Sequence, residues 1–297
     1  MSGRKSAIPK RHTVNPGERG GAELKDEKSW NIRVANGFST LGLQKICLTF
    51  KQIAGSSGTR SLKSSPDKKV LFVDNKENPL LIKAQLYPSL SGRLKSTIRY
   101  LLYRTKPATS LAAEFINSKT ANTRKLRTSR VLGYGCRFSS GLISQELLVT
   151  EACSDGMPLL QRLRQHEGND TDTEKYLQRA FLLIEHMLKA GYVHLDLHSD
   201  NILITSSEPG NDVLIDFEFA SHFPDERLPD VAAFVYGYLF RCQVREHISY
   251  ERYTVLVEQA IESLAGEQWN RNSFMKNFHL AATARIAKKK RQAYLKL

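Results

Sequence analysis

Short apolar runs bounded by polar or turn-forming residues fill much of the first half of the chain. Alternation of apolar and polar positions predicts a first strand over residues 45–50. Two further runs, 70–73 and 80–86, predict strands joined by a turn that contains Asp, Asn and Pro. An apolar run at 147–152 leads into polar residues and predicts another strand. We therefore expect a small sheet in this half.

Apolar residues change to helical spacing in the second half of the chain. Over residues 173–190 they recur on one broad face, and Gly191 supplies a C-terminal stop. The segments 228–236 and 250–264 predict two further helices. In the first half, a shorter helix is predicted to begin after Ser110, a candidate N-cap. The second half is therefore predicted to be mainly helical.

Composition limits the class of protein. The chain has 297 residues, a length that suits one two-lobed domain or two small domains. Its residues are 41% hydrophobic and 25% charged, which is ordinary for a soluble globular protein. Its four cysteines form no Cys-x-x-Cys pair, which argues against structural zinc or disulfides and favours a reducing compartment. Residues 1–27 are polar and aperiodic and predict a disordered tail. No run is apolar enough for a secretory signal or a membrane span, so we expect a cytosolic protein or one on a membrane face.

Basic residues are concentrated in two parts of a chain whose net charge is +14. Residues 91–130 hold ten Lys and Arg but one acid, Glu114, and residues 285–296 hold six Lys and Arg and no acid. Such clusters predict an anionic partner, which could be nucleic acid, an anionic membrane or a phosphorylated substrate. The plain alternative is a solvated surface.

Three polar residues accompany the runs 201–204 and 213–215, which predict two short buried strands. Asp196 precedes Asn201 by five positions, and Asp216 directly follows the second run. Phosphoryl transfer needs a carboxylate beside the acceptor hydroxyl and oxygen ligands for Mg²⁺. Asp196 can supply the first, and Asn201 and Asp216 the second. The five-residue step matches the kinase catalytic loop, whereas two buried strands with polar ends are the plain alternative.

Features upstream of this loop suit a bound nucleotide. Lys83 lies in an apolar strand and, if buried, needs an anionic partner, for which Glu114 is the nearest candidate in its basic segment. Such a pair orients ATP in kinases, although an edge lysine and a surface glutamate are the alternative. The loop from Gly55 to Gly58 can fold over phosphates through backbone N–H groups, or be a plain linker. Glu151 lies where a hinge would bind adenine through backbone groups.

In this order, over residues 45–240, the motifs resemble the protein-kinase-like superfamily. More narrowly, the chain is similar to the bacterial lipopolysaccharide core kinases, the Kdo and heptose kinase family. Three features carry the narrower resemblance: the basic segment 93–106, the sequence Val-Leu-Gly-Tyr-Gly at 131–135, and Glu218 where protein kinases carry glycine. The superfamily resemblance rests on Lys83, Glu114, His194-x-Asp196-x-x-x-x-Asn201 and Asp216-Phe-Glu218.

The resemblance implies an α+β, two-lobed protein-kinase-like fold. A small N-terminal lobe, residues 28–150, would hold an antiparallel ATP-binding sheet and the Glu114 helix. A larger, mainly helical C-terminal lobe, residues 151–297, would hold the catalytic loop, the metal site and a basic C-terminal helix. The implied reaction is ATP-dependent phosphorylation of a sugar hydroxyl (on Kdo or heptose) of the lipopolysaccharide inner core. It would occur in the cytoplasm, peripherally on the inner face of the inner membrane of a Gram-negative bacterium.

The resemblance also implies a role for each matching residue. Asp196 would be the base or acceptor-orienting carboxylate, and His198 stands where protein kinases place a lysine near the transferred phosphate. His194 would brace the loop, and Asp230 would hold its backbone in place. The remaining roles concern ATP and Mg²⁺: Lys83 and Glu114 would place the phosphates, and Asn201 and Asp216 would hold the metal.

Charge favours an anionic acceptor. Aminoglycoside kinases bind polycations, which a chain with a net charge of +14 would repel. The same charge would attract an anionic glycolipid at a membrane surface. We expect no nucleic acid, because the chain shows no recognisable RNA-binding module. Two alternatives stay open: an atypical protein- or RNA-associated kinase, and a pseudokinase that binds an anionic partner. The basic run 284–297 is interpreted either as a lipid-binding end, through Ile286, Tyr294, Leu295 and Leu297, or as a frayed, solvated helix end.

Overall fold

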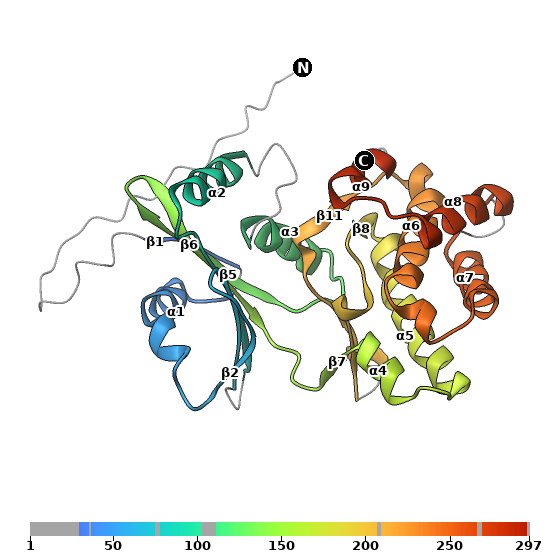
Figure 1. The fold of residues 1–297 in the computed structure, drawn as a ribbon, viewed down its shortest axis with the longest axis horizontal. Helices are drawn as coiled ribbons and strands as arrows, with labels where there is room; N and C mark the ends of the chain where they lie inside the picture. Colours follow the sequence, from blue (N-terminus) through green and yellow to red (C-terminus); the bar gives the residue numbers. More distant parts are fainter. Residues whose placement is uncertain are drawn as a thin grey trace, which may run out of the picture.

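The computed structural model describes residues 30–35, 37–74, 78–102, 111–206, 209–265 and 269–295. The predicted tail and the N-cap candidate Ser110 lie outside these residues. Figure 1 shows a lobe built on a twisted sheet beside a larger lobe made mainly of helices. The two-lobed α+β fold expected from the sequence is therefore confirmed.

The first lobe is built on six strands whose spatial neighbours all pair antiparallel, in the order β1-β5-β6-β4-β3-β2. The predicted strands at 70–73, 80–86 and 147–152 are confirmed within β3, β4 and β6. The strands are β1 (Trp30–Val34), β2 (Thr59–Ser64), β3 (Lys68–Val73), β4 (Leu80–Leu86), β5 (Val131–Ser139) and β6 (Leu142–Glu151).

The first predicted strand, at 45–50, is wrong, because this segment lies within helix α1 (Thr40–Ile53). The side chain of Ser39 caps the helix by accepting a backbone hydrogen bond at 3.2 Å. Six residues that alternate between apolar and polar fit a strand as well as one and a half turns of helix. Only the spacing of apolar residues over a longer segment distinguishes the two. The residues buried by the helix fall on one face at helical spacing: Leu43, Cys47 and Phe50.

Helices cover both faces of the sheet. Helix α1 packs on the face that carries Ile82, whereas Phe115 of helix α3 (Leu111–Thr123) packs on the opposite face with Leu148. Side chains alternate along a strand, so Lys83, next to Ile82, points to the side of α3. The lysine is thereby directed away from α1 and toward the second lobe.

Helix α2 (Leu90–Leu102) lies against strand β6. Its buried contact is polar: the Ser96 hydroxyl donates to the buried Glu146 carboxylate at 3.4 Å. The hydroxyls of Tyr87 and Tyr134 donate to the same carboxylate, Tyr134 at 2.6 Å. Three donors satisfy this carboxylate inside the lobe. Helix α2 is thus fixed to the sheet by its polar face.

The second lobe is mainly helical, and the helices predicted over 173–190, 228–236 and 250–264 are confirmed as α5, α6 and α7. Gly191 follows α5 with φ of +66°, the left-handed conformation that ends a helix. The helices are α4 (Leu159–Gln165), α5 (Asp170–Lys189), α6 (Leu228–Arg241), α7 (Tyr250–Ala265), α8 (Arg271–Thr283) and α9 (Arg291–Leu295). The short strands are β7 (Gly156–Pro158), β9 (Ile202–Thr205) and β10 (Val213–Leu214) in one sheet, and β8 (Tyr192–His194) and β11 (Ala220–His222) in another.

Helix α3 joins the two lobes through hydrogen bonds as well as packing. The side-chain amide of Asn117 donates to the Phe217 carbonyl at 2.9 Å, and the Tyr192 hydroxyl donates to the Asn117 carbonyl at 3.3 Å. Phe217 directly follows Asp216, and Asn117 lies one helical turn beyond Glu114. These contacts hold the Glu114 helix beside the end of β10.

Candidate active site

The catalytic-loop segment starts at the end of β8 with His194, which is fully buried. Its Nε2 lies 3.0 Å from the Ile215 carbonyl oxygen, and its Nδ1 accepts the Asp196 N–H at 3.2 Å. A carbonyl only accepts and an N–H only donates, so these partners assign the ring proton to Nε2. Burial lowers the pKa of the imidazole, which favours this neutral form. His194 therefore braces the loop against the strand that leads to Asp216.

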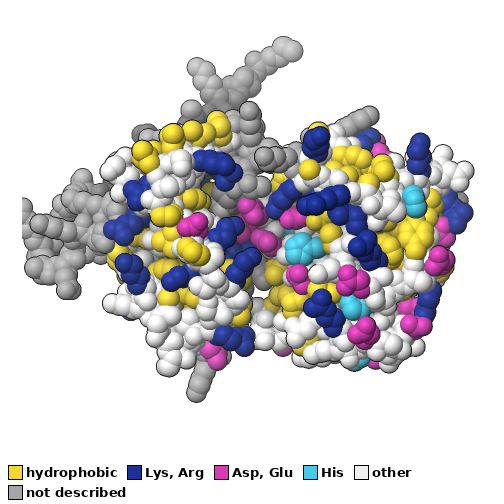
Figure 2. Space-filling model, viewed as in Figure 1, with side chains coloured by type: hydrophobic (Ala, Val, Ile, Leu, Met, Phe, Trp, Pro, Cys, Tyr) yellow, Lys and Arg dark blue, Asp and Glu magenta, His cyan; other side chains and the backbone are white. Residues whose placement is uncertain are grey.

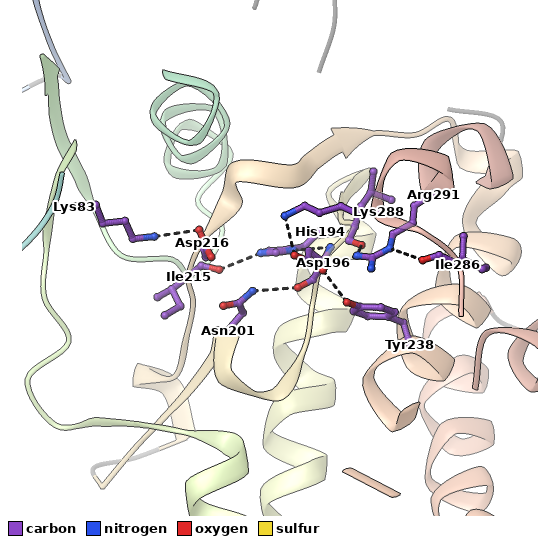
Figure 3. A network of polar contacts seen from close by, with 11 residues as sticks. Lys83, His194, Asp196, Asn201, Ile215, Asp216, Tyr238, Ile286, Lys288 and Arg291 are labelled. Carbon is purple, nitrogen blue, oxygen red and sulfur yellow. Dashed lines mark hydrogen bonds and ion pairs between the residues drawn. The ribbon is translucent and has the colours of Figure 1, made fainter. Parts of the chain in front are cut away.

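Asp196 lies at the centre of a polar network (Figure 3). Its Oδ1 accepts hydrogen bonds from the Tyr238 hydroxyl at 2.7 Å and from Arg291 Nη1 at 2.5 Å. Its Oδ2 accepts one from Lys288 Nζ at 2.9 Å. Burial alone would raise the pKa of this carboxyl, but the three hydrogen bonds lower it well below its usual range. Asp196 is therefore ionised at neutral pH.

Strands β9 and β10 bring Asn201 and Asp216 together, because the Ile215 N–H donates to the Asn201 carbonyl at 3.0 Å. The buried Asn201 side chain donates through Nδ2 to the Asp196 carbonyl at 3.1 Å, which leaves its Oδ1 to accept. Asp216 has φ of +65°, a strained conformation of the kind found at functional sites, and its side chain is 40% exposed. The two residues present the hard oxygen donors that Mg²⁺ prefers.

Lys83 links the sheet lobe to this site. Its Nζ lies 2.7 Å from Glu114 Oε1 and 3.1 Å from Asp216 Oδ1. Burial alone would lower the pKa of the ammonium group, but the charges of Glu114 and Asp216 outweigh it and raise the pKa above its usual range. The structure thus brings together Lys83 and Glu114, as predicted, and adds Asp216 as a second partner.

A cavity of about 520 Å³ lies beside these residues, between the sheet and the second lobe. The connection from Glu151 to Ser154, which joins the lobes, forms part of its wall. Its volume falls in the range of small-molecule sites. Apolar residues of both lobes line it, a lining that suits a flat heterocycle: Phe72 and Leu81 from the sheet, and Leu203 and Ile215 from the second lobe. Ile215 directly precedes Asp216, so the cavity wall adjoins the polar site in the chain.

Residues 88–226 match the model of the Lipopolysaccharide kinase (Kdo/WaaP) family. The matched segment contains Glu114, the connection at Glu151, the catalytic loop and Asp216. This segment is therefore similar to the lipopolysaccharide kinase family. The resemblance inferred from the sequence is thereby confirmed, and the protein is a phosphotransferase of the kinase type.

No curated protein sequence matches this kinase. A solved structure, "WaaP in complex with acyl carrier protein", is similar to it over 90% of this chain and 96% of that chain. The sequence identity is 11% and the TM-score is 0.49.

The glycine-serine loop lies elsewhere in the kinase than predicted. Gly55 and Gly58 connect helix α1 to strand β2, whereas the sequence had suggested a loop between two strands. The Gly58 carbonyl accepts the Asp74 N–H at 2.9 Å, at the end of β3. The cavity wall contains Arg60 and Leu62 of β2 and neither glycine. The expected place between two strands is wrong because residues 40–53 form a helix, so the loop precedes the β2–β3 hairpin; phosphate binding by the loop stays a prediction.

Glu151 and His198 have contacts that the sequence did not suggest. Glu151 lines the cavity as expected of a hinge residue, but its carboxylate pairs with Arg130 at 3.1 Å and its N–H donates to the Arg130 carbonyl. The imidazole of His198 lies 3.8 Å from the Asp200 carboxylate. The cation that contacts Asp196 Oδ2 is Lys288 instead.

The predicted role of Asp230 is wrong in its detail. Its carboxylate pairs with Arg227 at 3.0 Å and accepts the Asn277 side-chain amide at 2.8 Å, which ties α6 to α8. The catalytic-loop backbone is held by Arg291, whose Nη1 donates to the Leu195 carbonyl at 2.8 Å. The residue at the start of α6 is therefore structural, but the loop is clamped from the C-terminal segment.

The interpretation of the basic run 284–297 as a frayed, solvated helix end is wrong for its described part, and lipid binding by this run stays a prediction. The segment folds back onto the second lobe, where Arg291 and Leu295 are buried and Tyr294 packs on the core. Two of its cations, Lys288 and Arg291, contact Asp196, whereas Arg285 and Lys290 are exposed. Sequence reasoning missed three groups on Asp196: Tyr238, Lys288 and Arg291. The acid-free C-terminal cluster was the one available signal.

Proposed function

We propose that this kinase transfers the γ-phosphate of ATP to a sugar hydroxyl, on Kdo or heptose, of the lipopolysaccharide inner core. The observation that carries the proposal is the convergence of three charged groups beside one cavity. Lys83 contacts Asp216, and His194 connects the strand before Asp216 to Asp196. The arrangement supplies a phosphate-binding cation, a metal ligand and an acceptor-facing carboxylate, the parts that phosphoryl transfer needs.

The nucleotide side of the site uses residues of both lobes. The apolar walls of the cavity would hold the adenine ring, and Lys83, kept cationic by Glu114, would bind the phosphates. Asn201 and Asp216 would hold Mg²⁺, which neutralises phosphate charge when bound. Within the described residues no group of three or more His, Cys, Asp or Glu is arranged to hold a metal. A pair of oxygen donors fits Mg²⁺, which usually completes its octahedral shell with phosphate oxygens and water.

The acceptor side of the site is the carboxylate of Asp196. It would accept the hydrogen bond of the sugar hydroxyl and orient the oxygen toward the γ-phosphorus. Figure 2 shows Lys and Arg side chains bordering the acidic side chains at the centre of this face. A sugar flanked by carboxylates or phosphates is attracted by such a border. The anionic inner core is therefore the acceptor class that the charge favours.

Helix α2 supports a position at a membrane surface. Its polar face is turned inward, and all five large hydrophobic residues of its outer stripe are 44% to 73% exposed. The helix carries three cations and no acid, which suits an anionic surface at about 1 kcal/mol per cation. Interfacial helices combine such a stripe with basic flanks. The stripe is Leu90, Leu94, Ile98, Leu101 and Leu102, and the cations are Arg93, Lys95 and Arg99.

We infer that α2 docks the kinase on the anionic leaflet that contains its glycolipid substrate. No helix among the described residues has the length and apolar character to cross a bilayer. Peripheral attachment at the cytoplasmic face of the inner membrane would bring the acceptor to the enzyme. Figure 2 shows the hydrophobic side chains along the edge of the sheet lobe where Figure 1 places α2.

Vesicle sedimentation tests this docking. The double variant Leu94→Asp/Ile98→Asp is expected to lose at least tenfold in affinity for phosphatidylglycerol vesicles, because two charges enter the apolar contact. Leu182→Asp is the matched control, since Leu182 is 54% exposed on α5. Equal binding by the double variant and the control would exclude α2 as the docking element. Preserved activity on a soluble core sugar would show that the double variant is folded.

The proposed reaction is tested with γ-labelled ATP, Mg²⁺ and dephosphorylated inner-core glycolipid. Label is expected in the glycolipid with the wild-type protein and is expected to appear about a thousandfold more slowly with Asp196→Asn. Parallel reactions with protein and RNA acceptors identify the alternatives. Label in protein or RNA, but not in glycolipid, would favour the atypical kinase. Nucleotide binding without transfer to any acceptor would favour the pseudokinase.

A further inference from the structure

The C-terminal segment places two cations on the catalytic carboxylate from outside the segment that matches the family model. That match ends at residue 226, whereas Lys288 lies in the 3₁₀ turn η8 (Lys288–Lys290) and Arg291 opens α9. Lys288 Nζ is 2.9 Å from Asp196 Oδ2, and Arg291 Nη1 is 2.5 Å from Asp196 Oδ1. Figure 3 shows both side chains reaching the loop from the same side, opposite Lys83.

Arg291 is built into the protein as a clamp. Its side chain is 8% exposed, and it donates to the Leu195 carbonyl at 2.8 Å and the Ile286 carbonyl at 3.3 Å. The guanidinium also lies over the Tyr238 ring, 4.3 Å from its centroid. The segment is anchored beyond it, because Arg227 donates to the Leu295 carbonyl at 3.1 Å. Arg291 thus fixes both the backbone and the side chain of the loop.

The lone pairs of the Asp196 carboxylate limit where an acceptor hydroxyl can bind. Each carboxylate oxygen can accept about two hydrogen bonds. Oδ1 of Asp196 already accepts from Tyr238 and Arg291, whereas Oδ2 accepts from Lys288 alone among the described residues. The free acceptor position is therefore on Oδ2, directly beside Lys288 Nζ. A hydroxyl bound there lies next to the ammonium group.

Lys288 is placed to reach the transferred group. Its side chain is 37% exposed, and Nζ lies over the Phe219 ring, 5.5 Å from the centroid. Its charge also reaches the metal-side carboxylate: burial raises the pKa of Asp216, but Lys83, and more weakly Lys288, lower it. The ammonium group thus lies within electrostatic reach of both carboxylates that border the reaction.

We propose that Lys288 is a catalytic residue that contacts the phosphoryl group during transfer, and that Arg291 is a positioning residue for Asp196. This inference rests on the proposed kinase reaction. In that reaction the acceptor oxygen bonds to the γ-phosphorus, and the bond from that phosphorus to the β,γ-bridging oxygen breaks. The electron pair leaves on ADP, and the hydroxyl proton passes to Asp196 Oδ2. Lys288 stays protonated throughout and stabilises the negative charge on the equatorial oxygens.

The test compares Lys288→Ala with Lys290→Ala, a matched control on the same turn, where Lys290 is exposed. Lys288→Ala is expected to lower kcat a hundredfold to a thousandfold, both for glycolipid transfer and for ATP hydrolysis without acceptor. The KM for ATP is expected to stay within about threefold, because Lys83 binds the ground-state phosphates. Lys288→Arg should restore part of kcat, since it keeps the charge.

A binding measurement tests the same contact without turnover. ADP with aluminium fluoride mimics the phosphoryl group in flight and binds more tightly than ADP when transition-state contacts form. Lys288→Ala should lose at least tenfold of this preference, with unchanged affinity for ADP alone. Arg291→Lys is expected to lower kcat with unchanged ADP affinity, because a point charge does not reproduce the clamp on Leu195 and Asp196.

The outcomes separate this inference from the proposed function. Equal kcat and equal aluminium-fluoride preference in Lys288→Ala and Lys290→Ala would overturn the role of Lys288. A kcat above that of the wild type in Lys288→Ala would also overturn the role of Lys288. It would show that the C-terminal segment inhibits the enzyme. A third outcome is that the glycolipid is not labelled, while ATP hydrolysis and aluminium-fluoride binding still depend on Lys288. That outcome would contradict the assignment of the acceptor and leave the role of Lys288 in place.

Discussion

The proposed nucleotide side and the proposed acceptor side of the site both centre on an aspartate, but the two carboxylates have different surroundings. Among the residues that the structure describes, Asp216 pairs with one cation, Lys83, through one oxygen, and 40% of its side chain is exposed. Asp196 receives three donors on its two oxygens and is 23% exposed. The first arrangement leaves oxygen atoms for a metal, and the second fixes a carboxylate in one orientation with one free acceptor position.

The residues that contact the two aspartates also come from different parts of the fold. On the proposed nucleotide side, the helix of Glu114 packs on the segment that follows Asp216, and Lys83 joins both through its side chain. On the acceptor side, Asp196 depends on Tyr238 from α6 and on two cations from the C-terminal segment. Assembly of the acceptor side therefore requires the whole second lobe, and substitutions on the two sides should have separable kinetic effects.

The largest expected effect is that of Asp196→Asn. The amide keeps the shape but removes the charge that orients the acceptor, and general-base or orienting groups contribute about 10²–10⁴-fold. We expect kcat to fall about a thousandfold while the Kd for ATP, measured by calorimetry, changes less than threefold. A large loss of ATP affinity would show that Asp196 belongs to the nucleotide side and would break the comparison.

Lys83→Met should affect both activity and stability. Removal of the ammonium group leaves Glu114, which is 4% exposed, without its cation, and breaking a buried pair costs about 3–5 kcal/mol. We expect a higher KM for ATP, a hundredfold lower kcat and a lower free energy of unfolding in urea. Lys83→Met/Glu114→Gln should recover part of the stability and none of the activity. Recovery of activity in the double variant would contradict a role for Lys83 in phosphate binding.

Part of this arrangement follows from local sequence and part does not. The helix over 173–190, the strand at 80–86 and the polar ends of the strands around Asn201 were predicted because each pattern is complete within one window. The helix at 40–53 was mistaken for a strand because six residues of its face happen to alternate. No local pattern ties Arg291 to Leu195, which lies 96 positions earlier. Such contacts depend on how helices pack, which residue periodicity does not encode.

A smaller effect is expected for Tyr238→Phe. The substitution removes the hydroxyl that donates to Asp196 at 2.7 Å and leaves the ring, which packs on Arg291, in place. One hydrogen bond to a charged group contributes about 1.5–3 kcal/mol, so kcat should fall about tenfold or somewhat more. The KM for ATP should stay constant in steady-state kinetics. A change in that KM with constant kcat would assign Tyr238 to the nucleotide side.

The smallest expected effect is a chemical one at Cys153, which lines the cavity. Burial, assisted by Asp155, raises the pKa of this thiol to about 11. Alkylation should therefore be slow at pH 7 and should rise about tenfold per pH unit below the pKa. ATP is expected to protect the thiol, whereas the acceptor glycolipid is not. Mass spectrometry of the labelled peptide measures both rates, and equal protection by the two ligands would contradict the assignment of the cavity to the nucleotide.

The division of labour between the two aspartates is tested most directly by single-turnover phosphate transfer over a Mg²⁺ titration. Asp216→Asn is expected to lower the rate strongly at low Mg²⁺ and to recover part of it as Mg²⁺ rises, because a weaker ligand still binds the ion at higher concentration. Asp196→Asn should remain slow at every Mg²⁺ concentration. Identical Mg²⁺ dependence in the two variants would contradict the account, since both carboxylates would then act on the same side of the reaction.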